Sequence, residues 1–202
     1  MSKTRDASDA VAGIVPAAGR SERMGTPKPL LEVDGQTFVA RAVQLLRQGG
    51  CSPVVVVVAA ADEATREAAE TAGARVVENA AAHSEQVDSV RLALAALPDA
   101  PAALILPVDV PYVSATTVAA VVAAWQRGGA AIVLPEHDGV GGHPVLLDRT
   151  LFAALMETPQ PEGVRSLLTV HAADVETVAV DDAGALLDLD TPADLHRHGG
   201  TA

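Results

Sequence analysis

Aromatic residues, cysteine and long apolar runs are scarce in this 202-residue chain, and each shortage excludes a class of protein. Aromatic side chains make up only 2% of the residues, so the stacking platforms that bind single-stranded nucleic acid are not expected. The single cysteine, Cys51, excludes internal disulfides and cysteine-based zinc clusters, and fits a reducing compartment. No apolar run reaches the roughly 18 residues of a membrane helix, and residues 1–10 lack the apolar stretch of a signal peptide. We therefore expect a cytoplasmic protein with no membrane partner.

Positive charge is also in short supply. The chain has 14 basic and 26 acidic residues, which gives a formal net charge of -12. Affinity for DNA or RNA depends largely on a cationic surface, so a nucleic-acid partner is not expected. The chain has only two lysines, Lys3 and Lys28, so a generally lysine-rich surface does not explain the presence of Lys28.

Short apolar segments alternate with helical stretches along the whole chain. The run from Val54 to Val58 has no polar alternation, as expected of a strand that is covered on both faces within a parallel sheet. Helix caps are predicted at Asp62, Ser114 and Thr191. The predicted strands are residues 11–15, 54–59, 74–77, 103–106, 130–134, 145–147 and 175–180.

This βαβα alternation predicts one α/β domain. We expect a Rossmann-like three-layer sandwich with a mostly parallel, mixed central sheet over residues 10–197, with tails at residues 1–9 and 198–202. In such sheets ligands bind beyond the carboxyl ends of the strands, so the turns that follow the strands are where functional residues are expected.

The turn after the first predicted strand, residues 16–31, carries the strongest chemical signal. It holds Arg20, Arg23 and Lys28 against a single acid, so it is locally basic in an acidic chain. Gly19 permits positive φ and a close backbone approach, and backbone N–H groups in such a loop can form an anion-binding concavity. The turn contains neither G-x-x-x-x-G-K-[ST] nor G-x-G-x-x-G, which argues against an ATPase P-loop and a dinucleotide dehydrogenase. It therefore predicts a phosphate site of another type.

The same turn has the pattern Ala17-Ala18-Gly19-x-Ser21-x-Arg23-Met24-Gly25-x-x-Lys28-x-Leu30-Leu31. This pattern resembles the signature loop of the MobA-like nucleotidyltransferases, and is most similar to the molybdenum cofactor cytidylyltransferase branch. The resemblance implies a fold of the nucleotide-diphospho-sugar transferase type and a glycine-rich loop that wraps a triphosphate. It also implies that Arg23 and Lys28 contact phosphates, and that Lys28 supports the charge of the transition state. The nucleotide-binding residues that it implies in this loop are Ala17, Ala18, Gly19, Arg20, Ser21, Arg23 and Lys28.

Two acidic segments extend the resemblance. Asp109 follows an apolar strand, where it could be a turn former or a ligand of Mg²⁺, a cation usually held by one or two carboxylates plus substrate phosphates. Residues 107–111 resemble the family's C-D-M-P segment, whose aspartate binds magnesium, although valines replace the cysteine and methionine. Residues 187–195 resemble the ending D-I-D-T-P-E-D-L, which implies Asp190 as the second metal ligand, with Asp188 as the alternative.

Two further segments resemble family motifs. Ser89 lies in an Asp-Ser-Val segment similar to the one that reads the base in cytidylyltransferases, which implies a cytosine contact, although a helical serine often lies on a solvated face. Gly142 and His143 begin a segment similar to the family's G-H-P-V-L-F motif, which implies a place on the acceptor side of the cleft.

Together these features predict a nucleotidyltransferase that needs Mg²⁺. The resemblance implies transfer of CMP from CTP, with GMP as the alternative, onto a phosphorylated acceptor of the molybdopterin type, and a molybdoenzyme client. CTP is favoured because Ala17-Ala18-Gly19 is closer to the cytidylyl branch than to the L-A-G-G of guanylyl enzymes. One alternative is a 2-C-methyl-D-erythritol 4-phosphate cytidylyltransferase, although the H-D-A-A-R-P stretch of those enzymes is missing. The other is a non-catalytic nucleotide or cofactor carrier.

Overall fold

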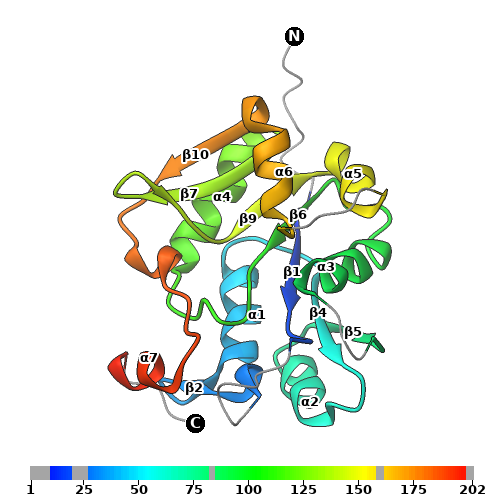
Figure 1. Ribbon diagram of the computed structural model, residues 1–202, viewed down its shortest axis with the longest axis vertical. Coiled ribbons are helices and arrows are strands. Elements are labelled where there is room, and N and C mark those ends of the chain that lie inside the picture. Colours follow the sequence, from blue (N-terminus) through cyan, green and yellow to red (C-terminus); the bar gives the residue numbers. More distant parts are fainter. Residues whose placement is uncertain (1–9, 20–26, 82–84, 158–161, 199–202) are drawn as a thin grey trace.

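A central sheet with helices on both faces forms the core of the protein (Figure 1). The structure is a computed structural model that describes residues 10–19, 27–81, 85–157 and 162–198. The strands lie in the order β10-β7-β9-β6-β1-β4-β5, with β8 paired to β7. Their bounds are β1 Ala12–Pro16, β4 Val54–Ala59, β5 Arg75–Asn79, β6 Ala102–Ile105, β7 Ile132–His137, β8 Val140–Gly141, β9 Val145–Asp148 and β10 Val175–Ala179.

Helices cover both faces of this sheet, so the predicted three-layer sandwich is confirmed. On one face lie α1 (Phe38–Gln48), α2 (Glu63–Thr71) and α4 (Ala115–Arg127). On the other lie α3 (Gln86–Ala95), α5 (Phe152–Glu157) and α6 (Arg165–Val170). Among the described residues, no helix is long and apolar enough to cross a membrane. The remaining elements are α7 (Pro192–Arg197), the β2 (Glu32–Val33) and β3 (Gln36–Thr37) ribbon, and the short helices η1 (Lys28–Leu30), η2 (Arg149–Leu151), η3 (Ala172–Asp174) and η4 (Ala183–Leu186).

All seven predicted strands are present, and the unbroken valine run of β4 shows why its prediction succeeded. Val54, Val56 and Val58 point into the core beneath α1 and α4, whereas Val55 and Val57 pack against the face that holds α3. Full burial of each such side chain contributes roughly 1.5–3 kcal/mol. Cys51 is buried beside this strand, and burial raises the pKa of its thiol to about 12, as expected of a structural cysteine.

One prediction about topology was wrong, because strand and helix do not alternate throughout. After β7 the chain turns directly into β8 and then into β9, which runs antiparallel between β6 and β7. The reason is local: Asp138 and Gly139 adopt positive φ angles of 50° and 77°, which suit a tight hairpin turn. The other central pairs, β1 with β4 and β6, and β4 with β5, are parallel, so the predicted mixed and mostly parallel sheet is correct.

The predicted helix caps are also present. Asp62 accepts a hydrogen bond from the Thr65 amide at 3.1 Å, and the Ser114 hydroxyl accepts one from the Thr117 amide at 3.1 Å. Thr191 forms the predicted capping box at the start of α7. Each cap satisfies a backbone donor that the first helical turn leaves unpaired.

The segment that leads to α7 is fixed to the rest of the fold by Asp182. Its carboxylate accepts hydrogen bonds from the Ser114 amide at 2.8 Å, the Thr117 hydroxyl at 2.5 Å and the Gly184 amide at 3.1 Å. Burial alone would raise the pKa of Asp182, but the hydrogen bonds from Thr117 and Ser114 outweigh it and lower that pKa. Further on, the Leu189 amide donates to the Asp109 carbonyl oxygen at 2.9 Å. These bonds hold the C-terminal segment beside the carboxyl end of β6.

Candidate active site

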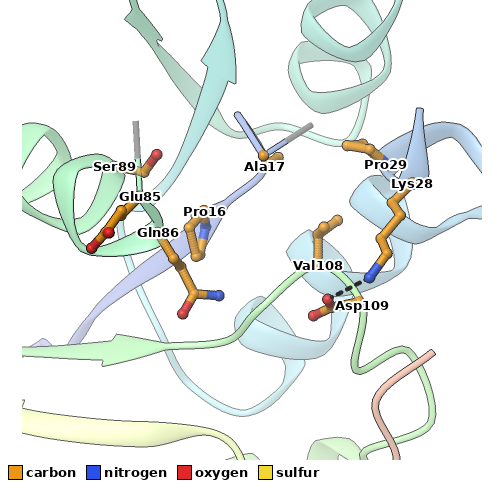
Figure 2. Close-up of a pocket in the computed structure, with 10 residues that line it drawn as sticks. Pro16, Ala17, Lys28, Pro29, Glu85, Gln86, Ser89, Val108 and Asp109 are labelled. Atoms are coloured by element: carbon orange, nitrogen blue, oxygen red, sulfur yellow. Dashed lines mark hydrogen bonds and ion pairs between the residues drawn. The ribbon is translucent and has the colours of Figure 1, made fainter. Parts of the chain in front are cut away.

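The topology of the sheet brings two predicted residues together. β1 and β6 are parallel neighbours, so their carboxyl ends meet at the same edge of the sheet. The chain that leaves β1 reaches Lys28, the first residue of η1, and the chain that leaves β6 turns at Asp109. The Lys28 Nζ donates a hydrogen bond to Asp109 Oδ2 at 3.0 Å (Figure 2). The basic turn and the first acidic segment therefore face one site.

Asp190 completes this cluster from the C-terminal segment. The Lys28 Nζ lies 2.6 Å from Asp190 Oδ1, so one ammonium group binds both carboxylates. The side chains differ in exposure: 16% for Lys28, 26% for Asp109 and 50% for Asp190. The buried Leu189 next to Asp190 fixes the position of the backbone there. Of the two carboxylates left open by the sequence, Asp190 and not Asp188 shares Lys28 with Asp109 in the described hydrogen bonds.

The electrostatics of the cluster keep Lys28 charged. Burial favours the neutral amine, but the hydrogen bonds and charges of Asp190 and Asp109 outweigh this effect and raise the pKa of Lys28. Asp188 lies nearby, and partial desolvation raises the pKa of its carboxyl. The charges of Asp109 and Asp190 raise that pKa further, against the opposing effect of His143 and Lys28.

A cavity of about 190 Å³ lies between the loop after β1 and the start of α3, and Figure 2 shows its lining. Ser89 belongs to the first turns of α3 and lines this cavity, with only 2% of its surface exposed. Its hydroxyl oxygen accepts a hydrogen bond from Asn79 Nδ2 at 3.4 Å, and among the described residues its O–H has no acceptor, so it can donate to a ligand. Ser89 is therefore a buried lining residue and does not lie on a solvated face. The lining comprises Pro16, Ala17, Gly19, Lys28, Pro29, Glu85, Gln86, Ser89, Val108 and Asp109.

The small residues after β1 have different roles. Ala17 is buried in the lining of the cavity, whereas Ala18 packs against the core on the face that holds α3. Gly19 does not adopt the positive φ that glycine permits. A Cβ placed on Gly19 would meet no described atom within 4 Å, so the backbone is open to close approach at this position. Three predicted residues of the loop, Arg20, Ser21 and Arg23, lie outside the described residues.

A second and larger cavity of about 770 Å³ adjoins the first, and Asp109 and Gln86 line both. The predicted acceptor-side residues Gly142 and His143 line this second cavity. A side chain at Gly142 would collide with the carbonyl oxygen of Ala185, so glycine is required there by a close backbone contact. The other lining residues are Pro107, Leu134, Val140, Gly141, Val145, Glu162, Val164, Arg165, Leu168, Ala185, Leu186 and Asp188.

His143 is positioned by its backbone, because its amide donates to the Ala185 carbonyl oxygen at 2.8 Å. Its Nδ1 atom is buried and has no hydrogen-bond partner among the described residues. Burial lowers the pKa of His143, although the carboxylates of Asp188 and Asp109 partly oppose this effect.

Sequence reasoning missed two residues of the larger cavity. Gln86 is the first residue of α3 and stands where the two cavities meet. Arg165 is the first residue of α6 and lines the larger cavity. Gln86 lies close to the Asp-Ser-Val segment that contains Ser89, so its place in the sequence could have marked it as a residue of the site. Nothing near Arg165 in the sequence marks it, because the rest of the cavity wall comes from distant segments.

Asp109 and Asp190 suit a hard divalent cation, because their carboxylates converge and Mg²⁺ is usually held by one or two carboxylates plus substrate phosphates. Among the described residues, no group of three or more His, Cys, Asp or Glu side chains forms a metal site. A cation at this position would therefore take further oxygen ligands from a bound substrate.

Comparison with known proteins agrees with this geometry. The family model described as the MobA-like NTP transferase domain matches residues 13–176. A 2-C-methyl-D-erythritol 4-phosphate cytidylyltransferase of Saccharopolyspora erythraea is 35% identical over 86% of this chain and 84% of its own. A nicotine blue oxidoreductase of Paenarthrobacter nicotinovorans is 30% identical over 93% of this chain and 95% of its own. The crystal structure of Rv0371c from Mycobacterium tuberculosis H37Rv in complex with manganese superposes with a TM-score of 0.77 at 30% identity, covering 94% of this chain and 98% of the other.

The family match covers most of the chain, and the lysine and the two aspartates are gathered at one edge of the sheet. This protein belongs to the MobA-like NTP transferase family, and its reaction class is nucleotidyl transfer.

Proposed function

We propose that this protein transfers a cytidylyl group from CTP to a phosphorylated small molecule, with Mg²⁺ as the cofactor, and releases pyrophosphate. The observation that carries the proposal is the Lys28 ammonium bound to both Asp109 and Asp190, where the two cavities meet. One cavity has room for part of a nucleotide, and the larger one has room for an acceptor.

The reaction needs no protein nucleophile. A phosphate oxygen of the acceptor attacks the α-phosphorus of CTP, a new P–O bond forms, and the bond to the β-phosphate oxygen breaks, so that pyrophosphate leaves with the electron pair. Such a displacement depends on positioning and on stabilisation of negative charge. Lys28 stabilises that charge, and Asp109 and Asp190 would hold the cation. Mg²⁺, when bound, would neutralise phosphate charge and align the reacting groups.

The preference for CTP rests on Ser89 and on the relatives. The O–H of the buried Ser89 has no acceptor among the described residues, and the ring of cytosine offers acceptors at O2 and N3. Several relatives are named cytidylyltransferases, among them those of Saccharopolyspora erythraea and Nocardia farcinica. Discrimination between CTP and GTP is the part of this proposal that depends on Ser89.

For the acceptor we favour a phosphorylated molecule of the molybdopterin type, which contains a ring system. The larger cavity has a volume of about 770 Å³ and an apolar wall that includes Leu134, Val145 and Leu168, which suits a ring system better than a small polyol. Methylerythritol phosphate is the second candidate, since relatives over 30% identical carry the name of that cytidylyltransferase. Against it stands the missing H-D-A-A-R-P stretch around Asp109. A molybdoenzyme that receives the product would be a downstream partner.

The test is pyrophosphate release from each of the four triphosphates, with Mg²⁺, in the presence of molybdopterin, methylerythritol phosphate or no acceptor. We expect release with CTP and molybdopterin. Release of pyrophosphate with methylerythritol phosphate but not with molybdopterin would support the second candidate acceptor. Binding of CTP without release under any condition would favour a carrier. Reduction of nicotine blue in the absence of transfer would instead align this protein with its oxidoreductase relative.

A further inference from the structure

Arg165 is a cation at the wall of the larger cavity, and its side chain has no partner among the described residues. Its guanidinium makes no hydrogen bond or ion pair with any residue that the structure describes, although the cavity contains carboxylates. Most other described arginines are engaged: Arg41 and Arg66, for example, pair with acids, and Arg47 and Arg149 donate to backbone carbonyl oxygens. The guanidinium of Arg165 is therefore available to a ligand.

The fold directs Arg165 towards the cavity. Leu167 is buried in the core and packs α6 onto the face of the sheet that also carries α3 and α5. Figure 1 shows α6 lying against the sheet. Residues 164, 165 and 168 are neighbours on this helix at spacings of three and four residues, and all three line the cavity. Val164 and Leu168 thus form an apolar wall next to the charge of Arg165.

The charge of Arg165 acts on His143, another residue of the cavity lining. Burial is the largest cause of the lowered pKa of His143, and the positive charge of Arg165 lowers that pKa further. The guanidinium and the imidazole therefore lie within electrostatic reach of each other. The other charged groups of the described lining are Asp109, Asp188 and Glu162, so without Arg165 the cavity would repel an anion.

We infer that Arg165 binds the anionic group of the acceptor, and that the acceptor is a phosphate monoester with an apolar, ring-like body lying against Val164 and Leu168. This inference rests on the proposed function, because it assigns the larger cavity to the acceptor. A guanidinium can bind a phosphate through two parallel N–H···O hydrogen bonds, which fixes the orientation of the ligand as well as its affinity. Arg165 would thus offset the repulsion between the incoming phosphate and the carboxylates of the site.

The test compares Arg165→Gln with Arg75→Gln. Arg75 is an exposed arginine on β5, at one edge of the sheet, and its side chain too makes no hydrogen bond or ion pair with the described residues. Both variants lose the same charge, so the comparison removes the effect of net charge. The probe is phenyl phosphate, a planar ring that carries a phosphate monoester, and its dissociation constant is measured by calorimetry beside that of CTP with Mg²⁺. Thermal unfolding checks that both variants are folded.

We expect Arg165→Gln to raise the dissociation constant of phenyl phosphate roughly 10- to 100-fold, the range for the loss of a charge-assisted hydrogen bond. Arg75→Gln should leave the dissociation constant of phenyl phosphate within about twofold of that of the parent. Both variants should bind CTP with the affinity of the parent. Equal phenyl phosphate affinity in the two variants, or no binding by the parent at millimolar concentration, would overturn the inference.

The same measurements distinguish the two phosphates that Arg165 could bind, that of the acceptor and those of CTP. Weaker CTP binding in Arg165→Gln, with phenyl phosphate unaffected, would assign Arg165 to the nucleotide and overturn the inference. Failure of the proposed function has another signature, which is the absence of pyrophosphate release by the parent with every acceptor. Binding of phenyl phosphate that depends on Arg165 would in that case still support an anion site in the larger cavity.

Discussion

Replacing Lys28 with methionine removes the cation between Asp109 and Asp190 and keeps most of the side-chain volume. Loss of one preorganised group that stabilises developing charge lowers turnover on the order of 10²- to 10³-fold. We expect this loss in kcat for pyrophosphate release with CTP and acceptor. Lys3→Met, which removes the chain's other lysine, is the matched control and should keep the activity of the parent.

The same change should also lower stability, because it leaves two carboxylates near each other without their shared cation. Breaking a buried ion pair costs about 3–5 kcal/mol, but half of the Asp190 side chain is exposed and solvent screens its charge. We therefore expect a loss of about 1–2 kcal/mol, equivalent to roughly 2–8 °C in Tm for a chain of this size. Added Mg²⁺ should raise the Tm of Lys28→Met more than that of the parent, because it replaces the missing positive charge.

The pH dependence gives a further check with a definite sign. The folded-state pKa of Lys28 is raised above its ordinary value of 10.5, so its contribution to stability is fully present below that value and is lost only as the pH rises through the folded-state pKa. In Lys28→Met the two carboxylates repel each other only while both are ionised, so the deficit in stability should shrink in acid. A folded variant with unchanged kcat, and with no greater response to Mg²⁺ than the parent, would refute this account of the cluster.

Three further changes probe other parts of the site. Asp109→Asn should lower kcat at least 100-fold and shift the Mg²⁺ titration to higher concentration; a titration that superposes on that of the parent would remove Asp109 as a ligand. Ser89→Ala should raise the KM for CTP about 3- to 10-fold, the effect of one neutral hydrogen bond, and unchanged selectivity between CTP and GTP would contradict the base contact. Asp182→Asn should lower the free energy of unfolding in urea by about 1–2 kcal/mol at neutral pH. Because the folded-state pKa of Asp182 is lowered, its contribution is present above the ordinary value of 3.8 and is lost as the pH falls through the folded-state pKa, so parent and variant should converge in acid; a constant difference would argue against its charge.

The fold was largely predictable where burial dictates the pattern. The run from Val54 to Ala59 was assigned to a strand with the bounds that are observed, since a strand covered on both faces must be apolar at every position. The antiparallel insertion of β9 was not predicted, because strand order depends on how the sheet packs as a whole. Asp138-Gly139 was the one local signal of that hairpin, and it was not used.

The site was predictable only where a motif or a strand end marks it. Lys28, Asp109 and Asp190 were named from their segments, and the structure brings them to one point. Arg165 could not be found in this way, because its importance comes from a cavity wall built by β7, β8, β9 and η4. Asp182 was missed for a similar reason, since its hydrogen-bond partners lie 65 and 68 positions earlier in the chain.

Asp109 and Asp190 stand 81 and 162 positions after Lys28, so the site is assembled from three widely separated parts of the chain, of which the segment with Asp190 is synthesised last. A nascent chain that stops just short of Asp190 would already contain every strand of the central sheet and both preceding partners. Such a product would lack the second carboxylate and the buried Leu195 of α7. Late nonsense mutations should therefore abolish chemistry even where a truncated polypeptide still accumulates in the cell.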